Sequence, residues 1–183
     1  YNDFRHTASL VYQGRENGIH AVLGYNYRKV DGYDYIANSK GKSNAVMDGQ
    51  ILDVQKNWKL GNDSMVLGYS YKREAYDATT PDAKRFRDSA VRTSNSLYTS
   101  YSKQFTPQFN LTLGLRGEFI NDPEEDQRVF VPQFQTEYKF DRNTAWYINV
   151  GKAFQMPTID DSFRYTNFNP NGLKPESGWT YET

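Results

Sequence analysis

Histidine, the side chain that most often acts as a general base, is scarce in this sequence, and it lacks the spacing that catalysis with a serine nucleophile needs. The histidines are His6 and His20, and neither has a serine two positions away on the same strand face. A serine hydrolase needs its nucleophile within hydrogen-bonding reach of a base. Cysteine is absent, which removes disulfides, cysteine metal sites and thiol catalysis. We therefore predict that the chain is not an enzyme and holds no cofactor. The histidines are interpreted as structural, with a haem-ligand role left open.

The segment 121–126, Asn-Asp-Pro-Glu-Glu-Asp, is rich in carboxylates. Carboxylate oxygens are ligands that Ca²⁺ prefers, but their spacing here is not that of an EF-hand loop. We interpret the segment as a solvated loop and predict no metal site, with calcium binding as the alternative.

Basic and aromatic side chains gather in two polar stretches, 30–46 and 74–92. If both stretches meet at one opening, they would suit an anionic, aromatic ligand through charge pairing and cation–π contact. Lys40, Lys42 and Lys84 add charge to the same stretches. Two alternatives stay open: long loops are polar in any case, and basic loops also bind lipopolysaccharide phosphates. The candidate ligand-binding residues are Tyr33, Tyr35, Arg85, Arg87 and Arg92.

The elements that must position these residues are strands, because apolar and polar side chains alternate with a period of two. In 109–119, for example, Phe109, Leu111 and Leu113 alternate with Asn110 and Thr112. Each alternating segment has about 10 residues, the length that a tilted strand needs to cross a bilayer. The predicted strands are 4–13, 19–28, 48–58, 64–73, 93–105, 109–119, 129–140 and 144–154, with a ninth beginning near Trp179.

Connections between these segments alternate between short and long. The short ones are turns rich in Gly, Asn, Asp and Pro, which suit tight turns; they lie at 15–18, 60–63, 106–108 and 141–143. The long ones are polar loops at about 30–46, 74–92, 120–128 and 156–177. Short turns on one side and long loops on the other are typical of outer-membrane barrels. We predict an all-β fold: an antiparallel up-and-down transmembrane β-barrel segment with short periplasmic turns and long extracellular loops.

Composition agrees with a membrane barrel. Mean hydropathy is −0.85, yet aromatic residues make up 16% of the chain. Disordered chains are polar but poor in aromatics, whereas a barrel combines a polar interior with aromatic girdles. The 22 basic and 22 acidic residues cancel, so nothing points to nucleic acid. No stretch has the roughly 18 consecutive apolar residues of a transmembrane helix.

Other β-folds remain open at this point. Eight strands suffice for a small self-contained outer-membrane barrel with a structural or adhesive role, and a soluble lipocalin-like binding module also alternates. The chain opens at Tyr1 without Met and stops inside the ninth predicted strand. We therefore expect both ends to be cuts within a longer barrel domain, to which residues 1–183 all belong.

The last 35 or so residues carry a motif beyond this periodicity. The segment 151–158 reads Gly-Lys-Ala-Phe-Gln-Met-Pro-Thr, and 169–182 contains Asn-Pro-Asn-Gly-Leu-Lys-Pro-Glu followed by Trp and Tyr-Glu. This resembles the barrel of TonB-dependent receptors, with Gln155 in place of the usual arginine and Gly172 inserted. The matching positions are Gly151, Phe154, Pro157, Asn169, Pro170, Leu173, Lys174, Pro175, Glu176, Trp179, Tyr181 and Glu182. Segment 111–116 also resembles a strand of that family.

The resemblance implies a wide barrel of about 22 strands with a plugged lumen in the bacterial outer membrane. It implies uptake of a scarce ligand such as a ferric siderophore, haem or cobalamin, energised through TonB. The plug, the segment that contacts TonB and the remaining strands would lie outside this chain. Lipid and lipopolysaccharide would surround it. The ligand itself is not identified by the sequence.

Overall fold

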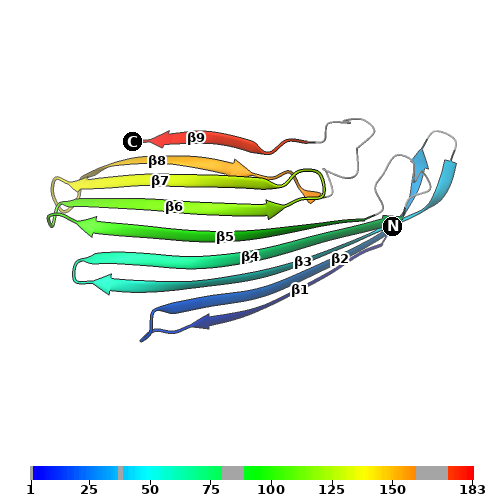
Figure 1. Cartoon of the computed structure of the whole chain (residues 1–183), viewed down its shortest axis with the longest axis horizontal. Helices are drawn as coiled ribbons and strands as arrows, with labels where there is room; N and C mark the ends of the chain where they lie inside the picture. Colours follow the sequence, from blue (N-terminus) through cyan, green and yellow to red (C-terminus); the bar gives the residue numbers. More distant parts are fainter. Residues whose placement is uncertain (1, 37–38, 80–88, 160–172) are drawn as a thin grey trace.

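In the computed structural model, residues 2–36, 39–79, 89–159 and 173–183 are described. Nine strands form one antiparallel sheet in which each strand pairs with the next along the chain. Figure 1 shows them side by side, with the short turns at the left and the long connections at the right. We call these the turn end and the loop end. The strands are β1 (Asn2–Gln13), β2 (Ile19–Ile36), β3 (Ser39–Leu60), β4 (Asp63–Thr79), β5 (Ser89–Gln104), β6 (Phe109–Asn121), β7 (Gln127–Lys139), β8 (Ala145–Gln155) and β9 (Glu176–Glu182).

Alternation along each strand gives the sheet two chemically different faces, because residues directly opposite in an antiparallel pair share a face. Leu113 of β6 pairs with Tyr101 of β5 and with Phe134 of β7, and Phe134 pairs in turn with Val150 of β8. This row defines the outer face; the opposite side is the inner face. Leu113 is 51% exposed and Phe134 is 38% exposed, so the outer face is apolar without being covered by the chain itself.

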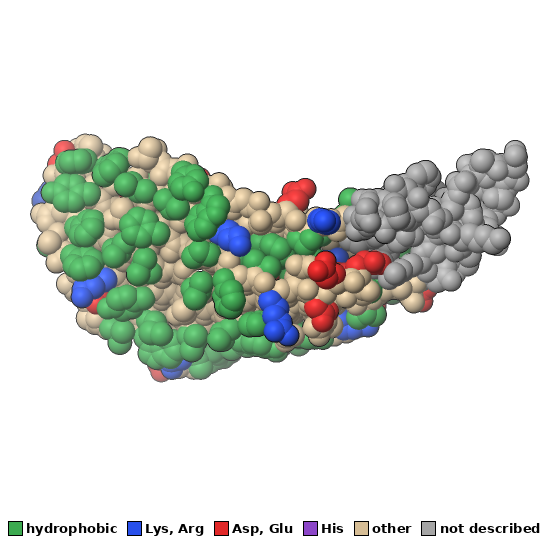
Figure 2. Space-filling view, turned by 45° about the horizontal axis from the view of Figure 1, so that its top comes forward, with side chains coloured by type: hydrophobic (Ala, Val, Ile, Leu, Met, Phe, Trp, Pro, Cys, Tyr) green, Lys and Arg blue, Asp and Glu red, His purple; other side chains and the backbone are tan. Residues whose placement is uncertain are grey.

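The outer face has the pattern expected of a surface that meets hydrocarbon. Figure 2 shows hydrophobic side chains gathered over the half toward the turn end. Charged side chains lie in the middle and toward the loop end, and others lie at the rim of the turn end. Lys56 and Lys103 lie near the turn end, over the rings of Trp58 at 5.7 Å and Phe105 at 5.1 Å. An amine placed beside an interfacial ring can reach the aqueous boundary while its stem stays apolar.

Local turn chemistry explains the tight turn end. Leu60 pairs with Asp63, which leaves the two-residue turn Gly61-Asn62. Gly61 has φ 68° and Gly18 has φ 67°, a conformation that glycine adopts without steric cost. Asp141 accepts hydrogen bonds from the backbone N–H groups of Asn143 (2.7 Å) and Thr144 (2.9 Å). The short turns at this end were predicted, and the structure confirms them.

The long loops are shorter than predicted, and the strands are longer. β2 and β3 stay paired until Ile36 meets Ser39, so most of 30–46 is strand and not loop. β4 likewise continues to Thr79 and β5 begins at Ser89. Residues 122–126 alone separate β6 from β7, and β8 runs to Gln155. Backbone pairing does not depend on side-chain polarity, so it continues past the apolar band. The alternation of apolar and polar residues therefore could not predict these extensions.

The sheet is open. β1 and β9 are its edges, and within the described residues each pairs with a single neighbour, β2 and β8. The edges lie apart in Figure 1. The described residues therefore do not close into a barrel; they form a curved open sheet. Among the described residues, no helix has both the length and the apolar character to cross a membrane.

The buried hydrophobic cluster lies on the inner face near the loop end. It contains Tyr76 and Ala78 of β4, Ala90 of β5 and Ile159, each 5–7% exposed. Ile159 follows β8 in the chain, although β8 is not a neighbour of β4 or β5 in the sheet. The chain after β8 therefore turns back across the inner face.

Candidate functional site

The inner face of β4–β6 carries several ion pairs. Along each strand, the charged residues of these pairs alternate with residues of the outer face. A carboxylate accompanies each cation of these pairs, so the charge of this surface is mixed and not simply cationic. The pairs are Lys72–Glu74 (2.9 Å), Arg92–Asp122 (2.5 Å) and Arg116–Glu118 (2.6 Å).

Arg116 is the centre of a hydrogen-bonded network on this face. Its Nε lies 2.6 Å from Glu118 Oε1, and its Nη2 donates to Ser96 Oγ at 3.0 Å. The guanidinium also lies 5.6 Å from the centre of the Tyr98 ring, within cation–π range. Tyr98 donates its hydroxyl proton to Asp53 at 3.0 Å. Strands β3, β5 and β6 are thus joined by side chains that hold one another in fixed positions.

Gly68 of β4 makes room for Tyr98. A Cβ atom placed on Gly68 would collide with Cζ of the Tyr98 ring, far inside van der Waals contact. Glycine therefore allows the aromatic ring to lie flat against the neighbouring strand. The ring and its hydroxyl reach Asp53 across β4 for this reason.

Arg92 makes the most deeply buried polar contact of the described inner face. Its side chain is 3% exposed and that of Asp122 is 4% exposed. While Nε pairs with Asp122, Nη1 donates to the carbonyl of Pro157 at 2.6 Å. One guanidinium thus joins β5, the connection after β6 and the segment after β8.

We call residues 156–159 the strap. They follow β8 and cross the inner face, and Ile159 ends in the hydrophobic cluster. The strap roofs a hollow of about 390 Å³ whose polar lining comes mainly from β4, β5 and β6 and includes Ser70, Lys72, Glu74, Arg92, Ser94, Ser96, Arg116 and Glu118, with Gln155 from β8.

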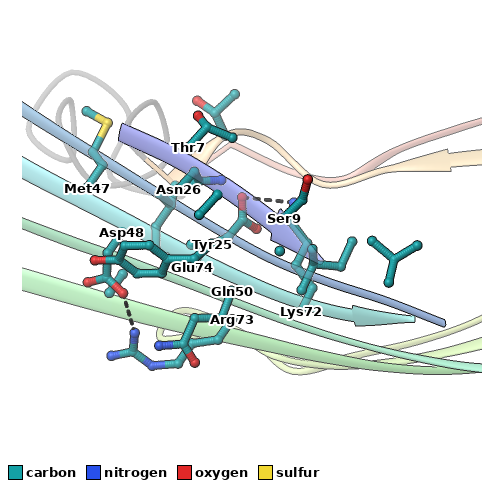
Figure 3. A pocket seen from close by; sticks show the side chains of 18 residues that line it. Thr7, Ser9, Tyr25, Asn26, Met47, Asp48, Gln50, Lys72, Arg73 and Glu74 are labelled. Atoms are coloured by element: carbon teal, nitrogen blue, oxygen red, sulfur yellow. Dashed lines mark hydrogen bonds and ion pairs between the residues drawn. The ribbon is translucent and has the colours of Figure 1, made fainter. Parts of the chain in front are cut away.

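A second hollow, of about 480 Å³, adjoins the first under Thr158 and Ile159. Figure 3 shows Thr7, Ser9 and Asn26 on one side of its strands, and the Asp48–Arg73 ion pair on the other side. Its floor includes Gly24 and Gly49, where the absence of a side chain exposes the backbone of the sheet. Together the two hollows form what we call the trough. Its volume is in the range of small-molecule sites.

The candidate ligand residues from the sequence lie in different surroundings. Tyr33 and Tyr35 belong to β2 and not to a loop, and their register partners are Lys42 and Lys40; their side chains lie outside the described residues. Arg85 and Arg87 also lie outside the described residues. Arg92 belongs to β5 and is buried against Asp122. Ligand roles for these five residues stay predictions.

The two halves of the sequence motif are brought together as neighbouring strands. Gly151 of β8 pairs with Thr180, Phe154 with Ser177, and Asn149 with Glu182. The Asn149 amide also donates to the Glu182 carboxylate at 3.2 Å. Pro157 lies in the strap, Trp179 and Tyr181 lie in β9 beyond Glu176, and Leu173, Lys174 and Pro175 lead into that strand. Asn169 and Pro170 lie outside the described residues.

The acidic segment has a structural role here. Asp122 pairs with Arg92 and accepts from the N–H of Glu124 at 3.0 Å, while Asp126 accepts from the N–H of Asp122 at 3.2 Å. Within the part of the chain that the structure describes, no three carboxylates or histidines are grouped as metal ligands. His6 packs edge-on against Phe4, with ring centres 4.4 Å apart.

Sequence reasoning did not identify the network of Asp53, Tyr98, Arg116 and Glu118. These residues occupy inner positions of predicted strands, so their face was available from the alternation. Their mutual contacts depend on register between strands that are distant in sequence, and nothing in the pattern of one strand gives that register.

Comparison with known proteins gives a family and a fold. The sequence matches the family described as TonB dependent receptor-like, beta-barrel, over residues 1–183. No curated protein matches it.

Among solved structures, the complex of FpvAI with pyocin S2 is similar with a TM-score of 0.56 at 15% identity, covering 98% of this chain and 30% of that one. The ferripyoverdine receptor of the outer membrane of Pseudomonas aeruginosa, bound to ferripyoverdine, is similar with a TM-score of 0.56 at 14% identity, with the same coverage. P. aeruginosa FpvA bound to a heterologous pyoverdine gives a TM-score of 0.52 at 12% identity, with 98% and 29% covered. These identities show likeness of fold alone, and the chain spans about 30% of the length of these structures.

Proposed function

Since the chain belongs to the TonB-dependent receptor-like β-barrel family, we propose that it builds part of the wall of an outer-membrane importer. In this proposal the full-length protein takes up a scarce ligand, with a ferric siderophore the first choice and haem or cobalamin the alternatives. Energy reaches it from the inner membrane through TonB. The loop end faces the outside medium, the turn end faces the periplasm, and the inner face lines the lumen.

The match over the whole chain is the observation that carries the proposal. Barrels of this family are outer-membrane proteins, and the family is one of receptors and transporters. The physical support is the two-faced sheet: an outer row of exposed Leu, Val and aromatic side chains suits hydrocarbon, whereas an inner face of paired charges suits a wet passage. A soluble lipocalin-like module would need the opposite arrangement, with its apolar row inside.

The preference for a siderophore rests on the relatives. One solved structure similar to this chain is named as a ferripyoverdine receptor bound to its ligand. At 14% identity the likeness shows the fold alone, so the siderophore class belongs to the proposal and is decided by the uptake experiment. The open sheet cannot enclose a passage on its own, so transport belongs to the full-length protein.

The test is uptake by the full-length protein in cells that lack their own ferric-siderophore receptors. Iron-starved cells receive radiolabelled ferric siderophores of different chemical classes, and separate cultures receive haem or cobalamin. We expect uptake of at least one ligand, and we expect it to stop when TonB is inactivated. The matched control is the same strain without the protein.

Two results would contradict the proposal. Uptake that continues unchanged without TonB would make the protein a passive pore. Failure to take up or bind any ligand of the panel, in cells where the protein is folded in the outer membrane, would remove the importer role.

A further inference from the structure

Two contacts between described residues fasten the strap to the inner face. Arg92 Nη1 donates to the Pro157 carbonyl at 2.6 Å, and Ile159, 7% exposed, packs with Tyr76, Ala78 and Ala90. Both contacts join the segment after β8 to β4 and β5, which are not neighbours of β8 in the sheet. The strap is therefore held by side chains and not by strand pairing.

Arg92 is itself held in place by Asp122. The pair is 2.5 Å apart, and the two side chains are 3% and 4% exposed. Removing one member of a buried pair leaves the other charge without compensation, which is strongly unfavourable. Arginine presents several donors in a rigid fork, so Nε and Nη1 can serve Asp122 and Pro157 at the same time. A lysine ammonium carries its donors on one compact point charge and cannot copy this planar fork.

The strap covers the trough. Met156, Pro157 and Thr158 line the roof of one hollow, and Thr158 and Ile159 line the roof of the other. The strap therefore forms part of the cover of both hollows.

We propose that Arg92 and Asp122 form a latch that holds the strap down on the inner face, and that the trough opens toward the loop end when this latch releases. The inference rests on the proposed function, in which the loop end faces the outside medium and the inner face lines the passage. The latch joins the connections after β6 and after β8, so displacement of either one releases the other.

The substitution Ala90→Cys introduces a thiol that reports the state of the strap. Ala90 is 5% exposed and lies beneath Ile159, and cysteine is a small, hydrophobic replacement. This chain contributes no cysteine of its own. In the full-length Ala90→Cys protein without other cysteines, kept in outer membranes, a water-soluble maleimide added from outside measures the rate at which the introduced thiol becomes accessible.

We expect slow labelling with the latch intact. Arg92→Met and Asp122→Asn should each raise the rate by about tenfold to a hundredfold, as expected for the loss of a hydrogen bond to a charged group that controls a local opening. The double variant should label no faster than the faster single one, because the two residues act as one unit. Arg92→Lys should give an intermediate labelling rate. Because it keeps a cation beside Asp122, it serves as the second variant if Arg92→Met folds poorly.

Arg116→Met is the matched control. It removes an arginine from the same face, but the bonds of Arg116 go to Glu118 and Ser96, so labelling of the introduced thiol should stay slow. Equal acceleration by Arg116→Met, or no acceleration by any change at Arg92 or Asp122, would overturn the latch. Labelling does not depend on transport, so the two proposals can fail separately. If the latch variants change the labelling rate but the protein imports nothing, the importer proposal alone is wrong. If the protein shows TonB-dependent uptake but the latch variants leave the labelling rate unaltered, the latch alone is wrong.

Discussion

At the scale of single residues, polarity on each face is set by position in the alternation. Leu113 lies in the middle of the outer row of β6, and it is 51% exposed in this sheet. Gln135 of β7 belongs to the inner face, where it pairs with Thr112. The two positions are close in space and differ in the medium that they meet, so the same substitution should have different effects at each.

Leu113→Arg is expected to destabilise the folded protein by about 2–4 kcal/mol, the cost of an arginine near the bilayer midplane. Gln135→Arg, on the inner face, should change stability by less than about 0.5 kcal/mol. Denaturant unfolding of the full-length protein in lipid vesicles measures both. Equal costs for the two variants would show that the outer face does not meet lipid.

Gly68→Ala is expected to destabilise the protein by about 1–3 kcal/mol, because the new Cβ would collide with the Tyr98 ring and displace the hydroxyl from Asp53. Tyr98→Ala in the same protein should relieve the collision, so the two changes should be non-additive. Gly178→Ala is the matched control, since no atom lies within 4 Å of its Cβ position. Additive effects in the unfolding measurement would argue against the close packing.

At the scale of elements, turns fix which strands become neighbours. Between β7 and β8, the Asp141 carboxylate accepts hydrogen bonds from the backbone N–H groups of Asn143 and Thr144. The hydrogen bond from the Asn143 N–H is the largest cause that lowers the pKa of Asp141 below its ordinary value. A carboxyl group whose pKa is lowered on folding adds stability above its unfolded pKa, and that stability is lost as the pH falls through the folded pKa.

Asp141→Asn should therefore be less stable than the parent protein at neutral pH, and the difference should shrink as the pH falls below about 3.9, the unfolded pKa of aspartate. Hydrogen exchange of the Asn143 and Thr144 amides at a series of pH values measures the change in this turn. A difference that stayed constant into acid would show that the charge of Asp141 contributes nothing.

At the scale of the whole molecule, the described strands form a sheet with two open edges. Leu10 on β1 is 70% exposed and Tyr181 on β9 is 72% exposed, and both strands have a free edge among the described residues of this chain. An unpaired strand edge is a template for further pairing. We infer that neighbouring strands of the full-length protein cover these edges and continue the outer and inner faces around the barrel.

Single cysteine substitutions along β6 in the full-length protein should then show a period of two in the membrane. Substitutions at Leu111, Leu113 and Leu115 should resist a water-soluble maleimide, and those at Asn110, Thr112 and Gly114 should react wherever nothing fills the lumen beside them. The rate of labelling of each variant in outer membranes measures the accessibility of its thiol. If the inner positions were protected and the outer positions reacted, the assignment of the two faces would be wrong.

Local sequence information determined most of the architecture. Eight strands were predicted, with a ninth expected near Trp179, and β9 begins at Glu176. The turn residues located the end where the connections are short. Faces also followed from the alternation: Leu111 and Leu113 alternate with Asn110 and Thr112 in the sequence, and in the sheet Leu111 and Leu113 lie together on the outer face. These features were predictable because they depend on side chains close together in the chain.

Tertiary structure decided what distant segments do to one another. No apolar alternation predicts the extension of β2 to Ile36 and of β3 from Ser39. Outside the apolar band neither face of a strand must be hydrophobic. Arg92 was expected on a loop, but it belongs to β5 and is buried beside Asp122, with Pro157 as a further partner among the described residues. Its ligand role stays a prediction. Only the register of β5 against β6 and the return of the chain after β8 bring these three residues together. A sequence states which groups are available, and the folded sheet decides which of them meet.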